Sequence, residues 1–369
     1  MPIQYWNLKP APDFTRLIRS LQIQGNQEFV PFLELFADPE IIAAFLDESV
    51  PLSTNDRPNH AKLEASINQK IRFWHALGYD AICDGPVLDF PGILSLESVD
   101  TAVYSRSTRK WVNEKSGQIT CWADFEHYPW PRAQNADFFP LEYMAAHLPS
   151  GMGILAMVSG IYELLSWLMG FETLCFALYK QPDLVGAICE RIKDVIVPVT
   201  QTLVQMDRVI GIWLGDDLGY RTSTFISPKH LRQYIFPIHK EIAEIAHKNN
   251  MPYLFHSCGC MKLIMEDLIT DVKIDAKHSF EDVIEPVEVF YSRYGKRVAV
   301  IGGIDVDLLS RGTEDQVRRR TREVLDSCAQ GGGYILGSGN SITNYTPLKN
   351  FLAMVDEGRK FNEIHQGAL

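Results

Sequence analysis

The sequence has no excess of basic residues. Its 35 lysines and arginines are outnumbered by 46 aspartates and glutamates, which gives a formal net charge of -11 at pH 7. A basic face supplies most of the affinity of a nucleic-acid-binding protein, so nucleic acid is excluded as the expected partner. The one basic cluster, RRRTR at 318–322, lies in a helical pattern and is typical of a solvent-exposed helix face.

Long apolar runs are also absent. Charged residues interrupt every run well before the roughly 18 residues that a membrane-spanning helix needs. The first residues, MPIQYWNLKPAPDF, lack the charged region followed by an apolar region that marks a secretory signal. We therefore expect a cytoplasmic protein with no membrane span.

Cysteine is scarce, with 7 residues in a chain of 369. An odd number spread so thinly is not a disulfide framework, and most of these thiols are expected to be buried and free. Only Cys258 and Cys260 cluster with a histidine, in the stretch YLFHSCGCMK at 253–262. That stretch is either a metal site or a group of buried neighbours.

Short apolar runs alternate with longer amphipathic patterns along the chain. Two helical patterns begin with capping residues, Ser227 and Thr313. Strands that alternate with helices predict a parallel sheet, and eight such units predict an α/β fold of the closed (β/α)8 TIM barrel type. An open doubly wound sheet is disfavoured because ELFADPE, after the first run, is not a G-x-G-x-x-G fingerprint. The eight predicted strands are residues 29–37, 79–85, 151–160, 209–217, 251–259, 272–279, 297–305 and 332–340.

Two segments do not fit the repeat. Residues 1–26 predict an N-terminal helical extension, and residues 96–136 predict an inserted β-hairpin with a turn at KSG. No linker or short repeat is visible, so we expect residues 1–369 to form a single domain. The aromatic residues of the insertion could serve a lid, a partner-docking rim or a homodimer contact, and the sequence leaves these three open.

Polar residues close most of the predicted strands. In a (β/α)8 barrel the active site is built at the carboxyl ends of the strands, so these residues are expected to converge on one pocket. Some have a simpler explanation, because Asp84 and Asp305 also suit helix or turn caps. Adjacent Asp216 and Asp217 point to opposite sides, and the sequence does not say which one faces the pocket. The strand-end candidates are Asp84, Ser159, Asp216, Asp217, His256, Cys258, Ser279, Glu281, Asp305, Ser338 and Asn340.

The stretch His256-Ser257-Cys258 is the strongest of these signals. Residues i and i+2 of a strand lie on one face, so His256 and Cys258 can project into the same site. An imidazole and a thiolate together suit zinc, and a catalytic zinc usually keeps three protein ligands and one open position. Cys260 is a less suitable ligand because the chain already turns at Gly259.

The stretches GDDLGYRTSTFISPKHLRQYIFP, MPYLFHSCG and VIEPVEVFYSRYGKRVAVIGGIDVDLL resemble the uroporphyrinogen decarboxylase superfamily, in its corrinoid-linked methyltransferase branch. The resemblance covers roughly residues 150–365. It implies zinc bound by His256 and Cys258, with Glu281 as a further ligand by similarity to cobalamin-independent methionine synthases. A cysteine after the last strand completes the zinc site in that branch, whereas this chain has Ser338 or Asn340 there.

The resemblance implies a zinc-dependent methyltransferase that works with a corrinoid. No D-x-H-x-x-G element is present to bind a corrinoid, so the cobamide is expected on a partner corrinoid protein. The loss of one thiolate favours a methylated oxygen or amine donor over a thiol. We assign catalytic roles and substrate contacts on this basis. The catalytic candidates are Asp84, Asp216 and Asp217, and the substrate-binding candidates are Tyr220, Ser338 and Asn340.

Two alternatives remain at this stage. A decarboxylase of a tetrapyrrole would use Asp84 to gather pyrrole N–H groups, but the arginine motif RQAGR that binds substrate carboxylates in that branch is missing. A barrel that binds a corrinoid protein without catalysis is the other alternative, and nothing in the sequence excludes it.

Overall fold

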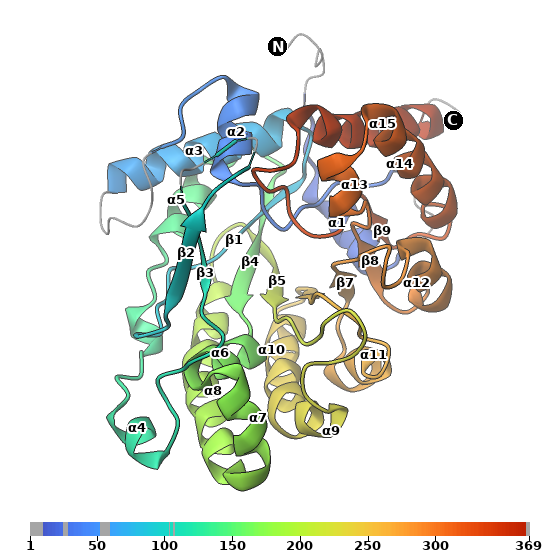
Figure 1. Ribbon diagram of the computed structural model, residues 1–369. Helices are drawn as coiled ribbons and strands as arrows, with labels where there is room; N and C mark the ends of the chain where they lie inside the picture. Colours follow the sequence, from blue (N-terminus) through green and yellow to red (C-terminus); the bar gives the residue numbers. More distant parts are fainter. Residues whose placement is uncertain (1–9, 25–28, 52–59, 103, 106–107, 367–369) are drawn as a thin grey trace.

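The computed structural model describes residues 10–24, 29–51, 60–102, 104–105 and 108–366. Its centre is a curled parallel sheet of seven strands in the order β1-β4-β5-β6-β7-β8-β9, with helices outside it (Figure 1). This confirms the predicted α/β barrel class, and each strand lies inside a predicted run. The strands are β1 (Ala81–Asp84), β4 (Gly153–Ser159), β5 (Val209–Gly215), β6 (Tyr253–His256), β7 (Ala276–His278), β8 (Ala299–Ile301) and β9 (Tyr334–Ile335).

The first predicted strand, residues 29–37, is extended but is not a regular strand. It pairs with the segment after β9 only through isolated bridges, Phe32 to Leu336 and Ala37 to Ile342. Pro31 has no N–H to donate, which limits regular pairing there. The segment therefore lies beside the end of β9, and it supplies Leu33 and Leu35 to the inner core.

The inner core consists of small and medium apolar side chains from alternate strand positions around Trp213. Helix α1 (Phe14–Leu21) adds Leu17 and Leu21 to this cluster. Arg16 of the same helix binds both carboxylate oxygens of Asp80, directly before β1, at 2.7 Å each. The N-terminal extension therefore closes the end of the barrel at which β1 begins.

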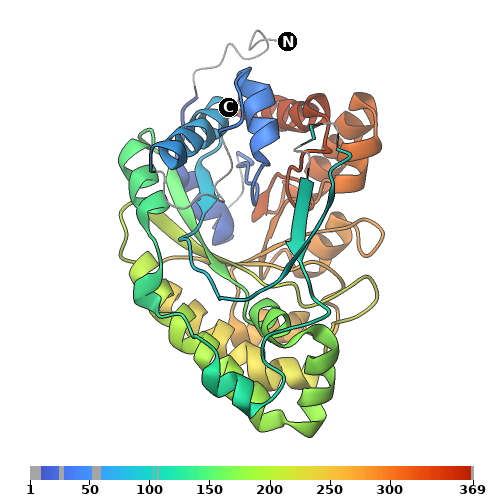
Figure 2. The ribbon, with the colours of Figure 1, turned by 60° about the vertical axis from the view of Figure 1, so that its left-hand side comes forward.

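The remaining helices form the outer layer (Figure 2). The predicted caps are present, since Ser227 accepts from His230 N and Thr313 accepts from Gln316 N. The helices are α2 (Pro39–Leu46), α3 (His60–Ala76), α5 (Phe139–His147), α6 (Ile161–Met169), α7 (Phe171–Lys180), α8 (Pro182–Leu203), α9 (Pro228–His230), η2 (Leu231–Ile235), α10 (Phe236–Lys248), α11 (Met265–Asp267), η3 (Leu268–Val272), α12 (Val287–Tyr294), α13 (Val306–Arg311), α14 (Glu314–Cys328) and α15 (Leu348–Gln366).

Within the described ranges no single helix combines the length and apolar composition required to cross a membrane. The pair α6 and α7 meets those two criteria only when taken together, and it is bent by 96° at its break.

The inserted segment contains the antiparallel pair β2 (Ser95–Val99) and β3 (Thr108–Val112), followed by α4 (Trp122–His127) and η1 (Ala133–Asn135). The predicted position of the turn is wrong, because KSG lies after β3 and not between β2 and β3. Gly117 of that motif instead packs on the end of α6, where an added Cβ would lie 2.2 Å from Met169 C. The glycine is thus required by a close backbone approach.

Candidate active site and metal centre

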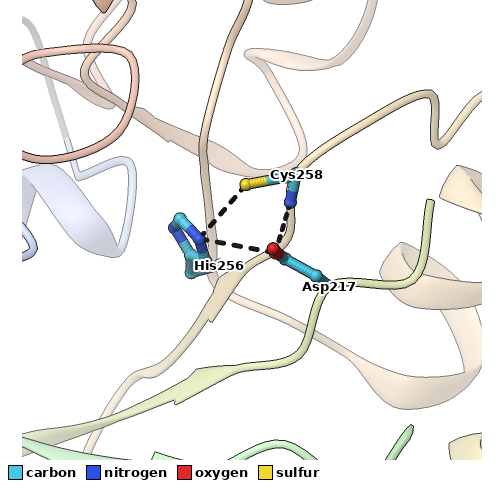
Figure 3. Close-up of side chains that lie close together, drawn as sticks. All are labelled: Asp217, His256 and Cys258. Carbon is cyan, nitrogen blue, oxygen red and sulfur yellow. Dashed lines mark hydrogen bonds and ion pairs between the residues drawn. The ribbon is translucent and has the colours of Figure 1, made fainter. Parts of the chain in front are cut away.

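Three potential metal ligands meet at the carboxyl ends of β5 and β6 (Figure 3). His256 is the last residue of β6, Cys258 follows two positions later, and Asp217 lies two positions beyond β5. His256 Nε2 is 3.7 Å from Cys258 Sγ and 3.6 Å from Asp217 Oδ1. The potential ligand atoms of all three lie within 4.8 Å of one another. We refer to Asp217, His256 and Cys258 as the donor cluster.

The loops after β5 and β6 are held together at the donor cluster. Cys258 N donates to Asp217 Oδ1 at 2.8 Å, and Cys260 N donates to Tyr220 O at 2.9 Å. Gly259, between the two cysteines, has φ +85° and packs so closely on Gly219 that an added Cβ would lie 2.3 Å from its carbonyl carbon. Only glycine fits there, and the resulting turn takes the Cys260 thiol out of the donor cluster.

Asp216 has a different role from its neighbour. Its buried carboxylate accepts Tyr162 N at 3.0 Å and Glu163 N at 2.9 Å, in the first turn of α6, and His239 Nε2 at 2.8 Å. The Tyr253 hydroxyl holds the other nitrogen of His239 at 3.0 Å. Asp216 thus fixes α6 and α10 to the end of β5. Asp217 is the aspartate of this pair that belongs to the donor cluster.

Burial controls the protonation of the donor cluster. It lowers the pKa of His256 to about 4, although the nearby Asp217 opposes this shift. Burial and, to a smaller extent, the charge of Asp217 raise the pKa of the Cys258 thiol to about 12. At neutral pH and without a cation, the imidazole is therefore neutral and the thiol is protonated.

Two further side chains surround the sulfur of Cys258. Asn340 Nδ2 donates to Sγ at 3.1 Å, and Ser279 Oγ donates at 3.6 Å. Gly339 allows the chain before Asn340 to pack closely on Phe280, because a Cβ added at Gly339 would lie 2.2 Å from Phe280 O. Asn340 therefore lies beside the cysteine at the place where the family resemblance puts a second one.

A buried lysine lies behind Ser279. The Lys277 ammonium donates to the carbonyl of Ser279, lies 4.2 Å from the centre of the Phe280 ring, and is 3% exposed. Burial lowers the pKa of Lys277 to about 8. Ser279 itself has φ +85°, a costly conformation for a residue with a side chain. The Lys277 contact helps to hold Ser279 in this conformation, in which its hydroxyl reaches Cys258.

Other predicted site residues lie apart from the donor cluster. Glu281 is exposed and does not join it. Tyr220 is 49% exposed, with its ring beside Phe225. Asp84, at the end of β1, pairs with Lys70 at 2.7 Å. Asp305 caps α13 by accepting Asp307 N at 2.7 Å, which is the simpler of its two explanations.

Ser338 is fully buried and has a partner that the sequence did not suggest. Its N–H and hydroxyl donate to the two carboxylate oxygens of Glu34 at 2.8 and 2.5 Å. Burial raises the pKa of Glu34 to about 8, so this carboxyl is largely protonated at neutral pH. A lone glutamate in the apolar run FVPFLELFA was the only signal for it.

The comparisons with known proteins give this site a context. A family model described as uroporphyrinogen decarboxylase (URO-D) matches residues 140–361. The chain belongs to the uroporphyrinogen decarboxylase family. Over 205 residues it is 26% identical to a methylated-thiol–coenzyme M methyltransferase of Methanosarcina mazei, an alignment that covers 55% of this chain and 52% of the relative. The alignment of this chain thus spans about half the length of the curated relative that it matches.

Solved structures support the same fold. A methyltransferase from Methanosarcina mazei matches with a TM-score of 0.70 at 16% identity, over 94% of this chain and 98% of that one. A B12-independent methionine synthase from Shewanella matches with a TM-score of 0.53 at 13% identity, over 92% and 97% of the two chains. Both likenesses concern the fold of this uroporphyrinogen decarboxylase family member.

The donor cluster of this family member fits zinc. One imidazole nitrogen, one sulfur and one carboxylate oxygen are the ligand types that zinc takes, and three protein ligands leave a fourth position for substrate or water. His256 is buried and Cys258 is partly buried, so a cation there would be partly shielded from solvent. Asp217, His256 and Cys258 would hold the metal, and Asn340 and Ser279 would support the sulfur.

We expect zinc binding by this family member to strengthen with pH. The pKa of Cys258 is about 12, so the thiol must lose a proton on binding, whereas His256, with a pKa of about 4, is already neutral. One released proton raises the association constant about tenfold per pH unit between roughly pH 6 and 9. Competition with a chelator of known pH dependence measures this slope. A slope near zero, or a release of two protons, would contradict the assignment.

Proposed function

We propose that this chain is a zinc-dependent methyltransferase that moves a methyl group between a small methylated donor and a cobamide on a partner corrinoid protein. The donor cluster at the carboxyl ends of the strands carries this proposal, since barrel enzymes place their chemistry there. Its membership of the uroporphyrinogen decarboxylase family and its similarity to a relative named as a methyltransferase support the same reaction class.

The side chains of this site would have different roles in methyl transfer. Asp217, His256 and Cys258 would hold the cation. Zinc, when bound, would supply a Lewis acid that polarises the heteroatom of the donor or acceptor. Asn340 and Ser279 donate hydrogen bonds to the Cys258 sulfur, which reduces the negative charge that this ligand can give to a metal.

We infer that the substrate that gives up the methyl group is a methylated oxygen or amine compound. The donor cluster has one thiolate, and the neighbour of that thiolate is the neutral amide of Asn340 instead of a second cysteine. Asp217 supplies an anionic oxygen in place of a second thiolate, and a carboxylate gives a cation less electron density than a thiolate does, which leaves a stronger Lewis acid for an oxygen or nitrogen atom. This methyl donor differs from the methylated thiol that appears in the name of the Methanosarcina relative.

The surroundings of Asp84 disfavour the decarboxylase alternative. One carboxylate oxygen of Asp84 pairs with Lys70 at 2.7 Å, and the other accepts Gly85 N at 2.9 Å. These two contacts take up part of the hydrogen-bonding capacity that the N–H groups of a tetrapyrrole would need, which disfavours that role for Asp84. The donor cluster would also have no use in a cofactor-free decarboxylation.

A methyl-transfer assay tests the proposed function. Zinc-loaded protein is mixed anaerobically with reduced free cobalamin and a methoxylated aromatic, a methylamine or a methylated thiol, and methylcobalamin formation is followed by absorbance. We expect transfer from an oxygen or amine donor and a loss of about a hundredfold or more in His256→Ala. The matched control, His127→Ala, changes an exposed histidine on α4 and should retain the activity.

Two results would count against this function. Zinc-loaded protein that transfers no methyl group from any of the three donors would contradict it. Release of carbon dioxide from a porphyrinogen by metal-free protein would favour the decarboxylase instead.

Replacement of Asn340 by cysteine tests the donor class. The new thiol would lie beside Cys258 and could serve as a second thiolate ligand. We expect Asn340→Cys to raise zinc affinity by about tenfold or more and to move the preference toward thiol substrates. Asn340→Ser is the control, because it removes the amide without adding a thiolate. Equal zinc affinity and equal donor preference in both variants would refute this role for Asn340.

A further inference from the structure

The neighbour of His256 on the next strand is another histidine. β6 and β7 pair in register with His256 opposite His278, and the two Nδ1 atoms are 2.8 Å apart. The ring centres are 5.0 Å apart and the planes are tilted by 40°. His278 is fully buried and His256 is 7% exposed, so bulk water hardly reaches this contact.

Two ring nitrogens at this distance share one proton. If His256 Nδ1 carries it, Nε2 of the neutral ring has a lone pair directed at Cys258 and Asp217. If His278 Nδ1 carries it, His256 must keep its own proton on Nε2 and cannot bind a cation through that atom. The arrangement within the histidine pair therefore decides whether the donor cluster has three ligands or two.

The surroundings of His278 favour the first arrangement. Its Nε2 is buried and makes no hydrogen bond with any described residue, and its ring meets the Trp213 ring at 5.2 Å and 88°. An edge-to-face pair allows an N–H to point at an aromatic face, which is a weak but favourable contact.

We propose that His278 is a positioning residue whose Nδ1 accepts the Nδ1–H of His256, which directs the Nε2 lone pair of His256 into the donor cluster. The inference rests on the proposed function, because it gives His256 a ligand role. The second nitrogen of a metal-binding histidine usually donates to a carboxylate, a backbone carbonyl or water. A neutral imidazole performs the same task here without adding negative charge, which preserves the Lewis acidity of the centre.

The test uses His278→Leu and His278→Asn. Leucine removes the acceptor, whereas the amide oxygen of asparagine lies at the same distance along the side chain as Nδ1 and can accept from His256. We expect His278→Leu to lower zinc affinity by about 10- to 100-fold and His278→Asn to stay within about threefold of the parent protein. Thermal unfolding of both variants separates this effect from a loss of stability. An equal loss of affinity in the two variants, or no loss in either, would overturn the inference.

A second measurement does not depend on metal binding. Nitrogen NMR of the metal-free full chain with ¹⁵N-labelled histidine reports the tautomer of His256, assigned through its loss in His256→Ala. We expect a protonated Nδ1 and an unprotonated Nε2 in the parent protein, and a changed pattern in His278→Leu. A proton on Nε2 of His256 in the parent protein would overturn the role of His278 even if zinc binds. A parent protein with the expected tautomer and no zinc affinity would leave the histidine contact intact and refute the proposed function.

Discussion

Replacement of Cys258 by serine is expected to lower the zinc affinity of the chain by at least about a hundredfold, at or beyond the upper end of the loss typical for residues that only support a ligand. A serine hydroxyl keeps the shape of the side chain but does not ionise as a thiol does, so it gives the cation no anionic ligand. The same loss is expected for His256→Ala, because this variant removes the imidazole nitrogen Nε2, which lies 3.7 Å from the same sulfur and would be a second ligand. Chelator competition at one pH measures both effects.

Cys260→Ser is the matched control for this prediction. Cys260 lies two positions beyond Cys258, and its backbone N–H bonds to Tyr220 O at 2.9 Å. Its thiol does not belong to the donor cluster. We expect zinc affinity to be unchanged in this variant. If Cys260→Ser lost zinc while Cys258→Ser kept it, the ligand assignment would be wrong.

The second large effect concerns stability and the buried Glu34. Burial raises the pKa of this carboxyl from 4.5 to about 8 in the folded chain. Between these values the unfolded chain has released the proton and the folded chain has kept it, so the free energy of unfolding falls as pH rises. The slope contributed by one such group is about 1.4 kcal/mol per pH unit, which amounts to several kcal/mol across the window.

Glu34→Gln is expected to remove this contribution. A glutamine remains neutral, and its amide can bond to both the N–H and the hydroxyl of Ser338. We expect the variant to be more stable than the parent protein at pH 8, by about 3 kcal/mol, and to lose most of that advantage at pH 5. Urea unfolding at the two pH values measures the difference. Glu241→Gln, at an exposed position of α10, is the control, and an equal pH dependence in all three proteins would refute the assignment.

Much of the fold could be predicted because its pattern is local. Seven of the eight apolar runs contain the strands of the sheet, and the caps at Ser227 and Thr313 begin helices as expected. The predictions failed where a distant part of the chain decides the local structure. Gly117 resembles a turn glycine, but it serves contact with α6, and Pro31 weakens the pairing of the first segment.

The residues of the site were likewise predictable where a local pattern places them and not where distant contacts do. The two-residue period of a strand was enough to suggest that His256 and Cys258 project into one site. The choice between Asp216 and Asp217 depended on α6 and His239, which a strand pattern does not contain. The spacing that suggested Glu281 ignored the backbone turn at Ser279, after which the Glu281 side chain is exposed. Asn340 was a candidate from the sequence, whereas Lys277 and His278 reach the site through the register of β7 with β6, which the sequence does not show.

The most direct test of the central claim is zinc analysis of the purified protein combined with X-ray absorption at the zinc edge. The donor cluster predicts about one zinc per chain, with one sulfur ligand and the remaining ligands nitrogen or oxygen at about 2.0 to 2.2 Å. The sulfur signal should disappear in Cys258→Ser and persist in Cys260→Ser. A protein that takes up no zinc, or a zinc site with two sulfur ligands, would contradict the account.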